Sequence, residues 1–209
     1  MKRPLTRCLS RNSDGIAATE FALVLPVFLL LTLGGLELTN LALAHLRVSQ
    51  MAMTVADNAG RVVAGIDEAN IYEVFSGADI QANNMDFNTN GRIILSALED
   101  NGRTGNEAGQ MIRWQRCWGE LPVAPAYGRE DAGRTNNSLA LGMGPATNRI
   151  TASRTTPVMF VEAVYQYEPL FGSIILAAPV IRYESAFNVR SRQNNAISNT
   201  QRLPVNACS

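Results

Sequence analysis

Few residues of this chain have the types and spacing that enzyme catalysis needs. His45 is the only histidine and lies beside a long apolar segment, so we expect neither a histidine-based triad nor a multi-histidine metal site in the remainder of the chain. The adjacent acidic pairs, at residues 67–68, 99–100 and 130–131, fit solvated turns. Folding could still bring two distant carboxylates together for hydrolysis. We expect no catalytic residue, no metal site and no cofactor.

The residues that do stand out come directly before the apolar segment. Gly15 is followed, after four residues, by Glu20 and Phe21. A carboxylate in the opening turns of a helix interacts favourably with the positive end of the helix dipole, which contributes about 0.3–1 kcal/mol. That effect does not explain the glycine or the basic residues before it. Residues 1–15 carry a formal charge of +3, from four basic residues and one acidic residue: Lys2, Arg3, Arg7, Arg11 and Asp14.

The element that must position Glu20 is a long apolar helix. Residues 21–36 are almost wholly apolar, and the pattern continues to Leu43. These 23 residues would span about 35 Å as a helix, enough for a hydrocarbon core of about 30 Å. The basic residues precede the span, so the positive-inside rule places residues 1–15 in the cytoplasm and the rest across the membrane. Glu37 and Asn40 fall near the far end, where we expect them to be solvated.

Two other interpretations of this segment remain open. Ala42-Leu43-Ala44 has the small-x-small pattern of a signal-peptide cleavage site, which would make the chain a secreted protein beginning near His45. The apolar region is, however, far longer than the roughly 7–15 residues of a signal peptide. An uncleaved simple anchor is the other possibility.

The stretch GIAATEFALVLPVFLLLTLGGLEL resembles the N-terminal signature of TadE-like proteins, minor pilin-like components of the tight adherence (Flp, type IVc) pilus system. In this resemblance Gly15 precedes the prepilin cleavage site, Ile16 becomes the new N-terminus, and Glu20 and Phe21 take the fifth and sixth mature positions. A later segment, residues 161–170, resembles a strand common in the same family. TadE itself, its companion TadF and other TadE-like relatives are not distinguished by these residues.

The resemblance implies a function for each of these residues. A prepilin peptidase would cut after Gly15 and free the amine of Ile16, which is mostly cationic at pH 7. Glu20 would then pair with the N-terminal amine of a neighbouring subunit in the bilayer, where an unpaired charge is costly. The implied partners are this peptidase, other pilins or pseudopilins, the inner-membrane assembly platform of the pilus and the lipid bilayer.

The pattern after the membrane span predicts an α+β domain. The helix continues to about residue 64 with an apolar stripe, and residues 66–80 form a second short helix. Residues 81–90 fit a surface turn region, and residues 119–156 fit loops. Period-two segments predict four strands, at residues 92–98, 111–117, 157–167 and 181–189. We therefore expect a single N-terminal transmembrane helix that extends into a pilin-like domain with a small antiparallel sheet. The expected parts are a leader (1–15), a membrane helix (16–45) and a periplasmic domain (46–209).

Cysteine positions agree with export. Cys8 belongs to the leader, whereas Cys117 and Cys208 lie in the external domain, where one disulfide could join them. Two unpaired thiols are the alternative, because spacing alone does not establish geometry.

The charge balance excludes a large basic surface for nucleic acid, since 18 basic residues face 18 acidic ones. We expect a non-enzymatic pilus-assembly component in the bacterial inner membrane, possessing a cytoplasmic N-terminus and a periplasmic domain, which could enter the pilus. The alternative is a membrane-anchored periplasmic domain that binds a ligand or catalyses hydrolysis.

Overall fold

A computed structural model describes residues 14–63, 65–82, 85–172, 178–190 and 195–208. The chain forms two compact units. The first comprises Met1–Ala42 and Pro169–Ala177, and the second comprises Leu43–Glu168 and Ala178–Ser209. Most of the basic leader, residues 1–13, lies outside the described residues.

The N-terminal element is one long helix, α2 (Asp14–Arg61), which is not interrupted by Pro26. Among the described residues it is the single helix that is long and apolar enough to cross a membrane. Its most apolar stretch is not buried within the molecule, and large side chains such as Phe21, Val24 and Leu30 are exposed. An apolar helix surface of this size is unfavourable in water, and it fits a membrane anchor.

After Leu43 the same helix changes character, because one side of it is buried in the second unit. The buried residues recur at intervals of three and four: Ala44, Val48, Met51, Ala52, Val55, Ala56 and Ala59. The predicted apolar stripe is therefore confirmed as far as Ala59. The predicted continuation of the helix to about residue 64 is wrong. The helix ends at Arg61, so Val63 leaves the helical periodicity and is exposed.

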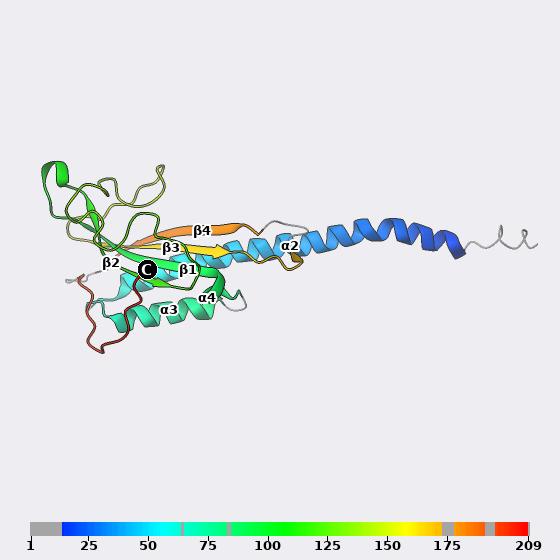
Figure 1. Ribbon diagram of the computed structural model, residues 1–209, viewed down its shortest axis with the longest axis horizontal. Helices are drawn as coiled ribbons and strands as arrows, with labels where there is room; N and C mark the ends of the chain where they lie inside the picture. Colours follow the sequence, from blue (N-terminus) through cyan, green and yellow to red (C-terminus); the bar gives the residue numbers. More distant parts are fainter. Residues whose placement is uncertain (1–13, 64, 83–84, 173–177, 191–194, 209) are drawn as a thin grey trace, which may run out of the picture. The chain divides into compact units, whose positions relative to one another are not determined.

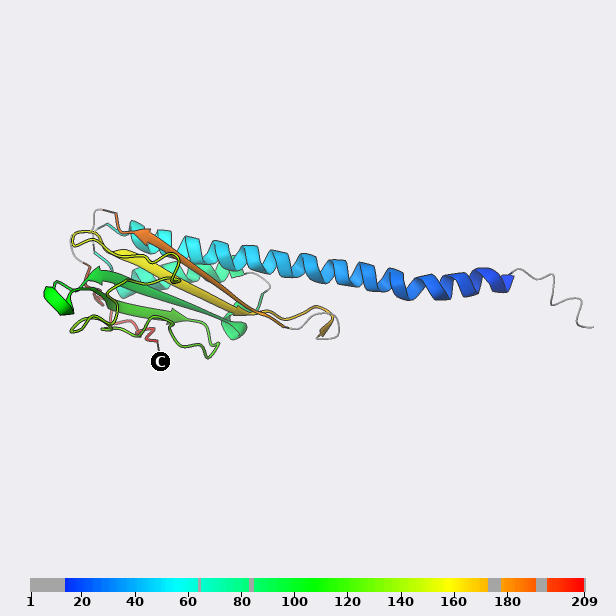
Figure 2. The same ribbon diagram turned by 90° about the horizontal axis from the view of Figure 1, so that it is seen from above.

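The second unit contains a four-stranded antiparallel sheet, which confirms the α+β prediction (Figures 1 and 2). Its strands are β1 (Gly91–Asp100), β2 (Gln110–Trp118), β3 (Val158–Gln166) and β4 (Val180–Asn188). They lie in the order β2-β1-β3-β4. All four strands fall where the period-two segments predicted them. The strand order is information that only the structure supplies.

Three short elements connect the long helix to the sheet and β1 to β2: α3 (Glu68–Ala82), α4 (Phe87–Asn90) and the 3-10 turn η1 (Gly105–Glu107). Helix α3 confirms the predicted second helix. The surface turn expected at residues 81–90 is partly wrong, because Phe87 is buried there. Its ring stacks on Trp118 and Tyr165, with centroids 5.5 and 5.7 Å away. This aromatic contact anchors α4 to the sheet. The local sequence pattern does not predict it.

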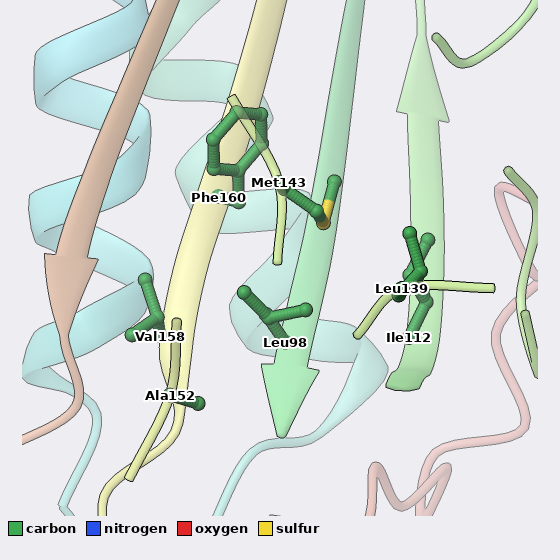
Figure 3. Close-up of a cluster of buried hydrophobic side chains, with 7 residues drawn as sticks. All are labelled: Leu98, Ile112, Leu139, Met143, Ala152, Val158 and Phe160. Atoms are coloured by element: carbon green, nitrogen blue, oxygen red, sulfur yellow. The ribbon is translucent and has the colours of Figure 1, made fainter. Parts of the chain in front are cut away.

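The long connection between β2 and β3 is made of turns, as predicted, yet it contributes to the core. Figure 3 shows Leu139, Met143 and Ala152 of this connection lying over Leu98 of β1, Ile112 of β2, and Val158 and Phe160 of β3. The helices lie behind the sheet in the same view. Both faces of the sheet are thereby covered, which explains why β1 and β3 are buried along nearly their whole length.

An ion pair links α3 to β2 inside this unit. Arg116 donates through Nε and Nη2 to Oε1 of Glu68, at 2.8 and 2.6 Å, and both side chains are buried. Arg116 Nη1 also donates to Oε2 of Glu130 at 2.9 Å. Removing one partner of such a pair leaves a buried charge uncompensated, so the pair fixes the position of α3 on the sheet.

The C-terminal segment is attached to the second unit by a disulfide and by hydrogen bonds. Cys117 and Cys208 are joined with their Cα atoms 5.0 Å apart, and the Cys117 amide donates to the carbonyl of Asn206 at 2.8 Å. Upstream, the indole N–H of Trp114 donates to the Asn195 carbonyl at 3.0 Å. The tail is thus held beside the edge strand β2.

Asp67 makes a further attachment. Its carboxylate accepts hydrogen bonds from the Ser198 hydroxyl at 2.6 Å, the Thr200 amide at 3.0 Å and the Ala69 amide at 3.1 Å. The hydrogen bond from Ser198, followed by those from the Thr200 and Ala69 amides, lowers the pKa of Asp67 from 3.8 to about 2. The ionised form of Asp67 therefore stabilises the folded tail.

The first prediction concerns the disulfide. It closes a loop of 91 residues, for which the chain-entropy model gives about 4–5 kcal/mol as an upper value. Replacing Cys117 and Cys208 by serine should lower the melting temperature by roughly 10–20 °C for a unit of this size. Mass analysis of the non-reduced, alkylated protein from an oxidising compartment should find no label on either cysteine. Two labelled thiols would contradict the assignment.

The second prediction concerns Asp67 and pH. A carboxyl group whose folded pKa is depressed adds stability above its unfolded pKa, and that stability is lost as the pH falls through the folded value. Wild-type protein should therefore melt above Asp67→Asn at pH 5 and higher, and the difference should shrink between pH about 4 and about 2. Asp79→Asn, at an exposed position of α3, is the matched control and should show no such pH-dependent difference. A wild-type advantage over Asp67→Asn that persists unchanged at pH 2 would refute the role of the ionised carboxylate.

Candidate functional site

Gly15 and Ile16 lie in the first turn of α2, and both are exposed. A side chain added at Gly15 would meet no other atom within 4 Å. The fold itself therefore does not require glycine at this position. Any requirement for a small residue here has to come from another molecule that contacts the segment.

Glu20 and Phe21 follow one turn later and point away from the rest of the described chain. Phe21 is exposed, and the Glu20 side chain forms no hydrogen bond or ion pair with any residue in the described ranges. Residues four apart lie on the same face of a helix, so Ile16 and Glu20 are neighbours on α2. Glu20 therefore places a carboxylate on an apolar, exposed helix surface. This carboxylate accepts no hydrogen bond from any described residue.

Glu37 has quite different surroundings, and the expectation that it is solvated is wrong. Its side chain is 0% exposed. Its two carboxylate oxygens accept hydrogen bonds from the backbone amides of Leu170 and Phe171, at 3.3 and 3.2 Å. All three residues belong to the first unit. The amides come from the start of the connection between β3 and β4. Part of it, residues 173–177, lies outside the described residues.

A second pair of carboxylates lies in the sheet of the second unit, where Glu162 of β3 and Glu184 of β4 are directly opposite each other. Glu162 is fully buried, accepts from the Ala126 amide at 3.1 Å and pairs with Arg182 at 3.3 Å. Burial raises the pKa of Glu162 to about 7, although the Ala126 amide and Arg182 oppose the shift. This pair is the kind of juxtaposition that sequence reasoning left open.

Glu184 is engaged by Tyr127, whose hydroxyl donates to its carboxylate at 2.9 and 3.0 Å. Desolvation, reinforced by this carboxylate, raises the pKa of Tyr127 to about 12. An open groove of about 660 Å³ lies beside the pair, lined by residues that include Ser49, Met53, Ile150, Phe160, Arg182 and Glu184. Glu162 accepts from the Ala126 amide and pairs with Arg182, and Glu184 accepts from the Tyr127 hydroxyl, so the two carboxylates hold residues 126–127 on the sheet.

Other candidate groups have structural partners. The Nδ1 atom of His45 lies 3.2 Å from the Tyr183 hydroxyl, and Trp114 is buried in the core. No cluster of three or more histidine, cysteine or acidic residues that could hold a metal ion occurs among the described residues. Glu20, near the start of α2, is the candidate carboxylate that has no such structural partner among the described residues.

Sequence reasoning missed Glu37 and the Glu162–Glu184 pair. A signal for Glu162 was present, since a carboxylate in the middle of an apolar strand needs a partner once the strand is buried. Glu37 carried a similar signal, because it follows sixteen almost wholly apolar residues. Neither signal identifies the partner of the carboxylate. The partner of Glu37, for example, lies 133 residues further along the chain.

The chain was compared with known proteins. Residues 15–57 match the family model described as TadE-like protein. No curated protein and no solved structure matches the chain. The matched region starts at Gly15 and contains Glu20, Phe21 and Glu37, and it ends within α2. The resemblance noted in the sequence is thereby confirmed over residues 15–57, which form most of the long N-terminal helix and are similar to TadE-like proteins.

Proposed function

We propose that this chain is a minor pilin or pseudopilin that acts without catalysis in the assembly of tight adherence (Flp, type IVc) pili. The TadE-like family implies a role in pilus assembly. The observation that carries the finer proposal is the state of Glu20, a carboxylate with no partner in the described chain on an exposed apolar helix. A charge in that position is costly in lipid until a second molecule neutralises it.

Cleavage after Gly15 by a prepilin peptidase would supply the neutralising group. The cut removes the +3 leader and leaves a cationic amine on Ile16. That amine on one subunit and Glu20 on its neighbour form a pair of opposite charge within the membrane. Association of helices would then be favoured over isolated subunits, because an unpaired carboxylate in the bilayer is unfavourable.

The leader also sets the proposed orientation. Four basic residues before the span favour a cytoplasmic N-terminus at the bacterial inner membrane. We assign residues 1–15 to the leader, 16–45 to the membrane helix and 46–209 to a periplasmic domain. The Cys117–Cys208 disulfide supports this assignment, because disulfides persist in the oxidising periplasm. The partners are the peptidase, other pilins or pseudopilins, the assembly platform and lipid.

An anchored domain that binds a ligand or catalyses hydrolysis is the competing function. The open groove beside Glu184 is the observation in its favour. Against hydrolysis, both carboxylates at this place already accept hydrogen bonds from other protein groups. The competing function also gives no purpose to Gly15 and Glu20.

The third prediction tests processing. Gly15→Val should retain the slower-migrating precursor, because a bulky residue at the cut site hinders the peptidase while the fold has room for it. Gly34→Val, at another helical glycine with nothing within 4 Å, is the matched control and should be processed normally. Electrophoresis of membrane fractions and N-terminal sequencing give the result. A mature N-terminus at Ile16 in the Gly15→Val protein would show that the assignment is wrong.

The fourth prediction tests Glu20. Glu20→Gln keeps the size and removes the charge, so the protein should still be processed and retained in the membrane. Piliation should fall at least about tenfold, which corresponds to about 1.4 kcal/mol of lost pairing. Electron micrographs of cells with matched protein levels provide the count. Glu73→Gln, on the exposed surface of α3, should leave piliation unchanged. Undiminished piliation in Glu20→Gln would leave this side chain with only its helix-dipole role.

A further inference from the structure

We propose that the start of the β3–β4 connection, at Leu170 and Phe171, forms a lipid-binding surface together with Leu36 and Leu38 of α2. The inference rests on the membrane span of the proposed function. It adds a second point of membrane contact, made by a segment that begins 133 residues after Glu37 in sequence. The partner that this surface binds is the outer interface of the bilayer that α2 crosses.

The attachment point is fixed by Glu37. Its carboxylate accepts from the amides of Leu170 and Phe171, and its side chain is fully buried by these contacts and their surroundings. The beginning of the connection is therefore held at one level of the helix.

That level coincides with a membrane boundary. Glu37 follows Ile16 by 21 residues, which corresponds to about 32 Å along a helix. The hydrocarbon core of a bilayer is about 30 Å thick. With Ile16 at the cytoplasmic interface, Glu37 and the attached connection lie at the opposite interface.

The exposed surface at this level is apolar. Leu170 is 60% exposed, and Leu36 and Leu38 on either side of Glu37 are 57% and 61% exposed. Residues 169–172, the described start of the connection, contain no charged residue. Since Glu37 is covered, its charge does not interrupt this surface. Apolar side chains at such a depth are removed from water by lipid.

The hydrogen bonds of Glu37 fit a lipid environment for a separate reason. In water, the amides of Leu170 and Phe171 could bond to solvent. At the edge of the hydrocarbon core water becomes scarce, so acceptors within the protein satisfy backbone N–H groups that face the acyl chains. The carboxylate supplies both acceptors, and the two amides in turn compensate its buried charge.

The test uses the full chain in vesicles of phosphatidylglycerol and phosphatidylcholine with dibrominated acyl chains, which quench nearby fluorophores. In a Cys8→Ser background, an environment-sensitive fluorophore is attached to Leu170→Cys, with the native disulfide left intact. The same label on Leu30→Cys marks the span, and on Leu141→Cys it marks an exposed leucine of the second unit. Aqueous iodide is the complementary quencher.

We expect the label at position 170 to be quenched by brominated lipid at least half as strongly as the label at position 30, and to be poorly accessible to iodide. A label at 170 that behaves like the one at 141 would overturn the inference while leaving the span intact. Shielding from both quenchers would overturn it too, because protein rather than lipid would cover the site. An unquenched label at position 30 would refute the membrane span, and with it both the proposed function and this inference.

Two further variants test the role of Glu37. Glu37→Ala removes both acceptors and should raise iodide accessibility at position 170 several-fold. Thr39→Val, whose hydroxyl bonds only within α2 to the Gly35 carbonyl, is the matched control and should leave the quenching unchanged. Equal quenching in the Glu37→Ala and wild-type proteins would show that the carboxylate does not position the connection.

Discussion

The constraint on which the structure depends is the removal of the apolar surface of α2 from water. A single continuous helix meets this requirement in two ways along its length. Before Leu43 its large apolar side chains are exposed on a helix long and apolar enough to cross a bilayer. After Leu43 one stripe, made mostly of the smaller residues alanine and valine, is buried in the second unit. The change from an all-round apolar surface to a striped one marks where the helix becomes the spine of the second unit.

The charged groups of the chain are explained by the same constraint. Where a carboxylate leaves water, hydrogen-bond donors accompany it: two amides at Glu37, an amide and Arg182 at Glu162, and Arg116 at Glu68. Glu20 is the exception within the described chain, because its surroundings hold no donor. An exposed, unpartnered charge on an apolar helix is costly in lipid until another group neutralises it, which is why this residue carries the functional proposal.

The sheet of the second unit needs cover on both faces, and the chain supplies it from segments with little regular structure. The β2–β3 connection places Leu139, Met143 and Ala152 on one face. The tail is held along the unit by the Cys117–Cys208 disulfide and by Asp67. These irregular segments make the second unit more rigid although they contain no further helices or strands. A domain of this kind can present loops and a groove to partners while its frame stays fixed.

Local sequence determined the parts of this protein that depend on neighbouring residues. The apolar run predicted α2, and the change of period from 3.6 to 2 predicted the four strands, because each periodicity follows from backbone geometry. The Gly15–Glu20–Phe21 spacing indicated the TadE-like signature that the family match then confirmed. Tertiary structure alone decided the strand order, the burial of Phe87, the partners of Glu37 and the meeting of Glu162 with Glu184. Each of these joins residues distant in the chain, and only the packing of the whole chain brings such residues together.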